Sequence, residues 1–372
     1  MNDLERLRCD VVRAASRAAD VEDVFRETDR RLRRHVGYAF AAWHTTDPSS
    51  LLATSCVVVG RDKNPADERF VHENEWHDDD VNKYADLASG DVPVATLHAA
   101  TGGHPERSRR HRELLQPLGM GDELRAGLLD GDSCWGTVTL YRQAAAGPFP
   151  AAEITAVRAI APLLGEAVRL TVLRRATEEP HEVPDGPGVL LLDADGEIVS
   201  ATGPAERHLG DLADPSQARS AVRALHARTS AAAAGRADAL VRSRLRARDG
   251  GWLVLHGSSN PLGGNVIVIE RARPAELADV IVAAYGFTPR EREVLAYVLR
   301  GLPSKQIARA LGISLYTVQD HLKAAFAKAG VTSRGELAAL LTDEHYRPMR
   351  RTGSPPGPYG WFLPADGGGT SR

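Results

Sequence analysis

The chain of 372 residues has a hydrophobic content of 43% and a net charge of −3, which predicts two or three globular domains. The overall charge indicates neither a nucleic-acid nor a membrane partner. No run of about 18 apolar residues and no signal-peptide core occur, so neither a membrane partner nor secretion is expected. The three cysteines, Cys9, Cys56 and Cys134, form no disulfide or metal-binding pattern, which is typical of a reducing cytoplasm.

Residues 1–176 predict a sheet with helices packed on it, because amphipathic stretches alternate with apolar runs that flank turn residues. The insertion at Asp62–Gly121 is polar and is expected to be largely irregular. The elements expected in chain order are a helical stretch Leu4–Val36, a hairpin turning at Asp47–Ser50, short helices at Asp80–Leu87 and Ser108–Leu115, a hairpin turning at Asp130–Asp132, and a helix Pro150–Arg175.

The segment Thr177–Gly188 is rich in proline, glycine and acidic residues, which is typical of a linker. Residues 189–272 then predict a hairpin with an Asp-Gly turn, helices within Pro204–Ala234, and three closing strands. Residues 273–287 predict a connecting helix, spanning Pro274–Tyr285. The tail at 346–372 has the proline and glycine content of a disordered segment.

The segment from Thr288 to Leu341 carries eight Lys and Arg against four Asp and Glu, so it is basic within an acidic chain. Thr288-Pro289-Arg290-Glu291 is a capping box that predicts the start of a helix. A second helix is expected from Ser304 and a third over Leu315–Ala329, which Ser314 caps and Gly330 ends. Another capping box, Ser333–Glu336, predicts a fourth. Short helices joined by a glycine-containing turn indicate a helix-turn-helix.

The residues "TPREREVLAYVLRG", "KQIARALGIS" and "TVQDHLKAAFAKAGVTSRGELAALL" resemble the LuxR-type helix-turn-helix of bacterial transcription factors. The resemblance runs over the whole predicted domain at 288–345 apart from its last residues. It departs from the family at Pro303 and Ser304, where serine and asparagine are usual. It implies that the third helix enters the major groove of double-stranded DNA.

The resemblance also implies which side chains contact DNA. Gln319, Asp320 and Lys323 are expected to face base edges, and each has donors or acceptors suited to a base. The side chains expected at the phosphate backbone are Ser304, Lys305, Thr317, Lys328 and Arg334, and such contacts fix register without reading sequence.

The N-terminal regions show weaker resemblances. "GMGDELRAGLLDGDSCWGTVTLYR" and the following "GPFPAAEITAVRAIAPLL" resemble the second half of a GAF sensor domain. "GVLLLDADGEIVSATGPAERHLG" and "RARDGGWLVLHGSS" resemble a PAS-type fold. Both folds bind small molecules or proteins, and the fold alone does not identify the ligand.

Several clusters could carry chemistry but have a simpler interpretation. Val71–Asp80, "VHENEWHDDD", holds His72, Glu73, Glu75 and His77, which could ligate a divalent metal, yet a polar insertion loop is favoured. His98, His104 and His111 are expected in an exposed loop. His208 and His226 could ligate haem, but surface or core positions are favoured. No nucleotide-binding, zinc-protease or serine-hydrolase motif occurs, so neither an enzyme, a metal nor a cofactor is expected.

The sequence therefore predicts an α+β protein, with GAF-like and PAS-like mixed sensor domains before an all-α four-helix LuxR-type helix-turn-helix. The predicted function is sequence-specific transcriptional regulation in response to an unknown signal. The alternative is a sensory adaptor whose helical module binds another protein, such as a sigma factor. The resemblance also allows RNA polymerase and a small-molecule ligand as partners. A homodimer is expected, through the helix Arg334–Leu341 or through the apolar stripe of Pro150–Arg175, unless that stripe covers the GAF-like sheet.

Overall fold

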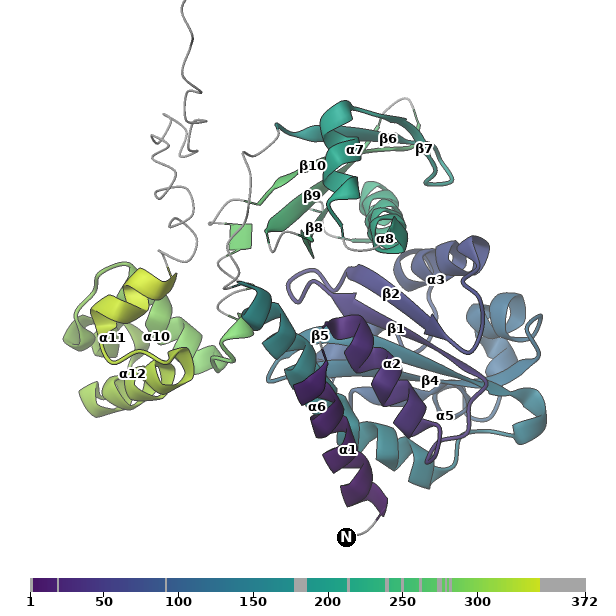
Figure 1. The fold of residues 1–372 in the computed structure, drawn as a ribbon, viewed down its shortest axis with the longest axis horizontal. Coiled ribbons are helices and arrows are strands. Elements are labelled where there is room, and N and C mark those ends of the chain that lie inside the picture. Colours follow the sequence, from purple (N-terminus) through teal and green to yellow (C-terminus); the bar gives the residue numbers. More distant parts are fainter. Residues whose placement is uncertain are drawn as a thin grey trace, which may run out of the picture. The chain divides into compact units, whose positions relative to one another are not determined.

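The computed structural model describes residues 3–18, 20–90, 92–176, 186–212, 215–237, 241–248, 251–260, 263–272, 276–277, 280 and 283–341. The fold is α+β, as predicted, and divides into two compact units (Figure 1). The N-terminal unit comprises Met1–Val172, Gly186–Arg248 and Trp252–Glu270. The C-terminal unit contains Arg271–Arg372. The predicted tail, most of the linker and much of the connecting helix lie outside the described residues.

The first sheet has five strands in the order β2-β1-β5-β4-β3, and all its neighbouring strands are antiparallel. Both predicted hairpins are confirmed, and Gly131 takes a φ of 59° in the second turn. That conformation suits glycine because it has no Cβ. The strands are β1 Phe40–Thr46, β2 Ala53–Val59, β3 Val94–Thr96, β4 Met120–Asp130 and β5 Ser133–Gln143.

Long helices accompany the first sheet. The predicted helical stretch at the N-terminus is two helices, α1 Asp3–Arg17 and α2 Val21–Leu32, because Asp20 adopts an extended conformation and caps α2. Helix α6, Ala151–Ala176, lies so close to β4 that a Cβ on Gly165 would be 2.5 Å from the carbonyl oxygen of Leu129.

The apolar stripe of α6 is buried within the chain. Val157, Ile160 and Leu164 are each at most 2% exposed. The alternative in which this stripe covers the sheet is therefore correct, and its proposed use as a dimer seam is wrong because packing within the chain already covers it.

The insertion between β2 and β3 is more ordered than predicted. Helix α3, Pro65–His77, starts at Asn64, whose side chain accepts a hydrogen bond from the Ala66 N–H. It contains most of "VHENEWHDDD", so the prediction of a loop there is wrong. The other elements are α4 Tyr84–Ser89, α5 Leu97–Ala100, the 3-10 turn η1 Pro105–Arg107 and the π-helical turn η2 His111–Leu115. The predicted helices at 80–87 and 108–115 are thus found, shifted by a few residues.

Buried polar pairing explains why a polar sequence forms this insertion. Asn74 is 1% exposed, and its side-chain amide donates to Asp78 and Asp80 and accepts from Arg110. Arg110 is fully buried and also donates to Glu123 of β4 at 2.6 Å. Hydrogen-bonded charges satisfy one another away from water, so polarity here does not indicate exposure.

The second sheet has the order β7-β6-β10-β9-β8. If the five strands of each sheet are numbered in chain order, both sheets have the order 2-1-5-4-3. The predicted hairpin, helices and three strands are all present, while assignment to the PAS type stays a prediction. The elements are β6 Gly188–Leu192, β7 Ile198–Ala201, α7 Gly203–Gly210, α8 Pro215–Ala233, β8 Val241–Arg246, β9 Trp252–Ser259 and β10 Asn265–Arg271.

The turn between β1 and β2 enters the core of the second sheet. Leu52 is 1% exposed and packs in the apolar cluster formed by the second sheet and α8. The fully buried Asp47 carboxylate accepts the backbone N–H of Arg244 at 2.9 Å and its guanidinium at 3.1 Å. Helix α8 also packs on β2 and α3 (Figure 1). The turn between β1 and β2 and helix α8 therefore join the two sheets.

The C-terminal unit contains the predicted helices α10 Pro289–Leu299, α11 Ser304–Leu311 and α12 Leu315–Ala329, followed by a helical segment at 334–341. The capping box at Thr288 and Glu291 is formed. Val294, Ile307 and Val318 belong to one buried cluster that joins α10, α11 and α12. Across the described ranges, no helix is both long and apolar enough to span a membrane.

Candidate nucleic-acid interface and ligand pocket

The turn between α11 and α12 has the geometry that its sequence predicts. Gly312 takes a φ of 64°, and the Ser314 hydroxyl accepts the Thr317 N–H at 3.0 Å. The Thr317 hydroxyl lies 2.8 Å from the same Ser314 oxygen. These contacts fix the direction in which α12 leaves the turn.

Helix α12 has one buried and one outward face. Val318, Leu322 and Ala325 are buried against the neighbouring helices. The predicted base-reading residues Gln319, Asp320 and Lys323 are all exposed on the other face. Tyr316, near the start of the same helix, is 79% exposed, and it belongs to the polar face that the sequence pattern leaves open to a partner. The structure thus brings the three predicted residues onto one surface that a partner can reach.

The predicted phosphate-contacting residues differ in their surroundings. Lys305 is exposed, and Ser304 and Thr317 are half-buried at the starts of α11 and α12. Lys328 instead donates to Glu291 at 2.7 Å and to the Gly286 carbonyl at 3.0 Å. Arg334 donates to the carbonyls of Val298 and Leu302. These internal contacts were not predicted from the sequence, and the DNA contacts of all five stay predictions.

Lys328 joins the end of α12 to the start of α10 through Glu291, which also closes the capping box. Burial raises the pKa of Glu291, but the hydrogen bonds from Lys328 and from the Thr288 backbone outweigh it and leave the pKa below its usual value. A lowered carboxylate pKa indicates that the charged form is stabilised.

Lys328→Ala is expected to lower the free energy of unfolding of the helical module by about 1–2 kcal/mol, because a charged hydrogen bond to a buried carboxylate is lost. Thermal unfolding of the full chain, followed by circular dichroism of the helices, measures this. Arg300→Ala, at an exposed position on the same unit, is the control. Equal stability of the two variants would contradict the role given to Lys328.

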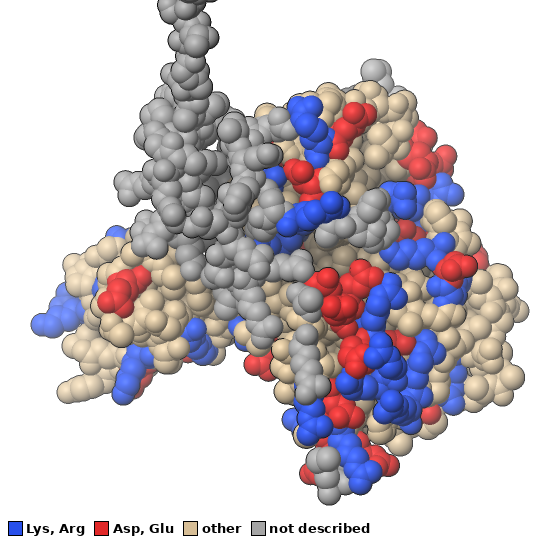
Figure 2. All heavy atoms as spheres, viewed as in Figure 1, with Lys and Arg blue, Asp and Glu red and all other residues tan. Residues whose placement is uncertain are grey.

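The arginine-rich surface of α1 and α2 is not a candidate site. Arg26 pairs with Glu22 at 2.6 Å and Arg33 with Asp29 at 2.7 Å. Figure 2 shows basic and acidic side chains interspersed over this surface. The charges therefore compensate one another locally.

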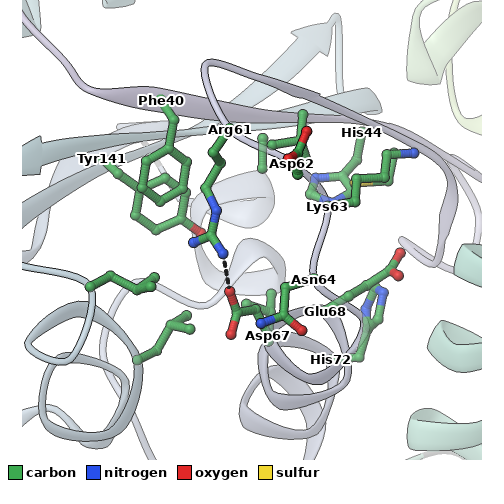
Figure 3. A pocket seen from close by; sticks show the side chains of 16 residues that line it. Phe40, His44, Arg61, Asp62, Lys63, Asn64, Asp67, Glu68, His72 and Tyr141 are labelled. Atoms are coloured by element: carbon green, nitrogen blue, oxygen red, sulfur yellow. Dashed lines mark hydrogen bonds and ion pairs between the residues drawn. The ribbon is translucent and has the colours of Figure 1, made fainter.

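A pocket lies between the first sheet and the insertion, with about 600 Å³ of space not filled by atoms, its open mouth included. Phe40 and Tyr141 stack on one side with ring centroids 4.3 Å apart. Figure 3 shows Arg61 extending from the sheet side toward Asp67 on α3. The apolar part of the lining is Ala42, Val58, Val71, Leu114 and Leu118.

Two buried histidines line this pocket, His44 from β1 and His72 from α3, at 8% and 7% exposure. Their ring centroids are 6.5 Å apart. Among the described residues, Nδ1 of His44 and Nε2 of His72 have no hydrogen-bond partner. Burial, helped by His72 and Arg125, lowers the pKa of His44 to about 3. Burial also lowers the pKa of His72, against the effect of Glu68 and Glu75. Both rings are therefore neutral at pH 7.

Two charged side chains of the pocket lining, Arg61 and Glu68, are paired. Arg61 donates to Asp67 at 2.6 Å and lies 4.9 Å from the Phe40 ring centroid. Glu68, on the same face of α3 as His72, accepts from Arg223 of α8 at 3.1 Å. Glu68 thus connects the pocket wall to the second sheet's helix.

The other histidines and acids singled out in the sequence do not converge on a site. His77 contacts the Ala227 carbonyl at 2.8 Å, and Glu75 accepts from Arg125 at 3.0 Å. His208 and His226 are buried, as favoured, and lie within hydrogen-bonding distance of the Gly186 carbonyl and the Asn265 amide. The predicted exposed loop around His104 is only partly correct, because it forms short helical turns and buries Arg110.

Comparison with known proteins finds family matches for both the helix-turn-helix and the region of the first sheet. Residues 286–341 match the family described as bacterial regulatory proteins, luxR family, and residues 20–168 match the GAF domain. Over 57 residues the chain is 44% identical to the nitrate/nitrite response regulator protein NarL of Escherichia coli, covering 15% of this chain and 26% of the relative. Over 52 residues it is 48% identical to a monoamine regulon transcriptional regulator of Klebsiella aerogenes, covering 14% and 23%. The chain thus spans about a quarter of the length of these relatives.

Among solved structures, the chromophore-binding domain of a bacteriophytochrome from R. palustris aligns with a TM-score of 0.33 and 12% identity, over 46% of this chain and 62% of that one. The two family matches coincide with the helix-turn-helix and with the first sheet and its helices. Residues 286–341 therefore carry a domain of the bacterial regulatory proteins of the luxR family, and residues 20–168 carry a GAF domain.

Proposed function

We propose that the protein is a sequence-specific DNA-binding transcription regulator whose N-terminal unit senses a signal. The observation that carries the proposal is the match of residues 286–341 to the luxR family, together with the exposed Gln319, Asp320 and Lys323 on one face of α12. A helix presented in this way by a helix-turn-helix fits the major groove. Relatives of this module are transcriptional regulators.

Footprinting of the full chain on genomic fragments tests the proposal. A protected site with two-fold symmetry is expected, because one module contacts too few base pairs to be specific and paired half-sites supply the rest. We propose that the protein acts as a homodimer on such sites and that RNA polymerase is a further partner. Leu337 and Leu341 are buried within the chain, so other residues of 334–341 would have to form a dimer contact. Absence of any protected fragment would favour the adaptor function instead.

We propose further that the second sheet is PAS-like. Its support is the order β7-β6-β10-β9-β8, which repeats the succession of the GAF sheet with helices α7 and α8 between its strands. In this function the second sheet holds α3 of the GAF domain in place through α8.

Lys323→Ala is expected to weaken binding to the specific site by about 1–3 kcal/mol and to relax preference at one base pair. Lys305→Ala is the matched comparison, because Lys305 is also exposed but lies at the start of α11. It should weaken binding to every DNA sequence and reduce the number of counterions released on binding, measured from the salt dependence of the affinity, by about one. Both are measured by titration against a panel of sites at several salt concentrations. Identical behaviour of the two variants across the panel would show that the assignment of base-reading and phosphate-contacting residues is wrong.

A further inference from the structure

We propose that the pocket lined by His44 and His72 binds a small uncharged molecule with an apolar body and a hydroxyl group, and that the hydroxyl is held by the two imidazoles. The inference rests on the sensing role proposed for the N-terminal unit and names the ligand class for it. Three properties of the pocket support the three parts of this class.

The hydroxyl group of the proposed ligand is inferred from ring nitrogens of His44 and His72 that have no hydrogen-bond partner among the described residues. Buried polar groups are nearly always hydrogen-bonded, and exceptions indicate a missing water, ion or ligand. His44 and His72 each have a buried ring nitrogen without a partner among the described residues. A neutral imidazole has one N–H donor and one acceptor nitrogen. A hydroxyl can donate to one ring and accept from the other, which fits two neutral rings 6.5 Å apart.

The absence of charge on the ligand is inferred from the balance of charges in the pocket lining. Arg61 is occupied by Asp67, and Glu68 by Arg223. The lining also holds Asp62 and Lys63, one of each sign. The charges of the pocket lining therefore compensate one another. A charged ligand would lose its hydration on entering the pocket, and a lining of balanced charge would not offset that cost.

The small apolar body follows from the size and lining of the cavity. The space open to the centre of a water-sized sphere is about 70 Å³, less than the roughly 150 Å³ of an engineered cavity that binds benzene. Ala42, Val58, Val71 and Leu114 line it. A single ring can thus enter only with part of its surface toward the open mouth.

A second pocket of about 450 Å³ shares His44, His72 and Val71 with the first. The histidine pair thus stands between two spaces. The second pocket is lined by Thr46, Thr137 and Tyr84. Near the two histidines it is therefore more polar than the first pocket. Water is the natural occupant of that side, and the hydroxyl compound fits the apolar side.

Calorimetric titration of the full chain at pH 7 tests the proposal with phenol as the probe. Toluene is the comparison without a hydroxyl, and benzoate and benzylammonium are the charged comparisons. Saturable binding of phenol is expected, with affinity at least about fivefold above toluene, as one hydrogen bond contributes roughly 1 kcal/mol. Equal binding of toluene, tighter binding of either ion, or no saturable binding of phenol would each overturn it.

His72→Leu and His44→Leu provide a second, independent measurement. Each removes one of the two proposed hydrogen bonds and is therefore expected to reduce the affinity for phenol about fivefold, while toluene binding persists and shows that the pocket is intact. His104→Leu is the control, because that ring is 56% exposed and lies outside the pocket. Unchanged phenol affinity in both pocket variants would overturn the assignment of the two imidazoles. Should neither variant fold, the four-probe comparison on the unaltered chain decides alone.

These titrations contain no DNA, so they separate the inference from the proposed function. A chain that protects a DNA site but binds none of the four probes would retain its proposed function and lose this ligand class. A chain that binds phenol but protects no DNA fragment would retain this ligand class and lose its proposed function.

Discussion

Asp47→Ala is expected to lower the free energy of unfolding of the N-terminal unit by about 3–5 kcal/mol, the usual effect of removing one partner of a buried ion pair. Both side chains are at most 1% exposed. Without Asp47, the guanidinium and the backbone N–H of Arg244 lose this acceptor. The Ser49 N–H, which donates to the same carboxylate at 2.9 Å, loses it too. Urea unfolding of the full chain, followed by tryptophan fluorescence, measures the change.

The matched control is an exposed ion pair in the same unit. Arg69 and Asp195 lie 3.3 Å apart, with side chains 39% and 75% exposed. Arg69→Ala should therefore change the free energy of unfolding by less than about 1 kcal/mol. Replacing both buried partners, as Asp47→Leu with Arg244→Met, should recover part of the loss because no charge stays unpaired. A similar effect of Asp47→Ala and Arg69→Ala would show that the buried pair does not join the two sheets.

The second large effect concerns pH. His44 has a pKa of about 3 in the folded chain and about 6.5 when unfolded. Between these values the unfolded chain binds the extra proton, so stability is full above pH 6.5 and falls as the pH falls toward 3. The slope is about 1.4 kcal/mol per pH unit. From pH 6.5 to 4.5 the loss due to this residue is thus about 2 kcal/mol, and His72, whose pKa is also lowered, adds to it.

Urea unfolding at several pH values, for the unaltered chain and for His44→Gln, isolates this contribution. Any constant destabilisation by the substitution cancels when the slopes are compared. The variant should lose stability less steeply between pH 6.5 and 4.5, whereas His104→Gln should keep the original slope. Parallel curves for the unaltered chain and His44→Gln would mean that His44 is not held neutral by its surroundings, which include His72, Arg125 and Lys63.

The sequence predicted the helical module nearly completely because its signals are local. The cap at Ser314, the box at Thr288 and the glycines at 312 and 330 act within four residues of the backbone groups they satisfy. The residues predicted to face DNA followed from the family resemblance, and the structure adds that three of them share an exposed face. The internal contacts of Lys328 reach back 37 residues to Glu291, which no local pattern indicates.

The GAF pocket was not predicted, because the features that build it are distant in sequence. His44 and His72 come from different elements, and the polar run that contains His72 suggested exposure. The burial of Asn74 and Arg110 depends on pairing across 36 residues, so composition pointed in the wrong direction. The Asp47–Arg244 pair spans 197 residues, and within its own turn Asp47 has only the features of an ordinary turn residue.

The turn between β1 and β2 limits how this protein can be re-engineered. Sensor regions are often exchanged between proteins by cutting in a linker, and residues 177–188 look suited to such a cut. A graft that began after this linker would, however, carry Arg244 without Asp47 and a core without Leu52. A transplantable sensing cassette therefore has to include both sheets, and chimeras made from either sheet alone should be insoluble or unfolded.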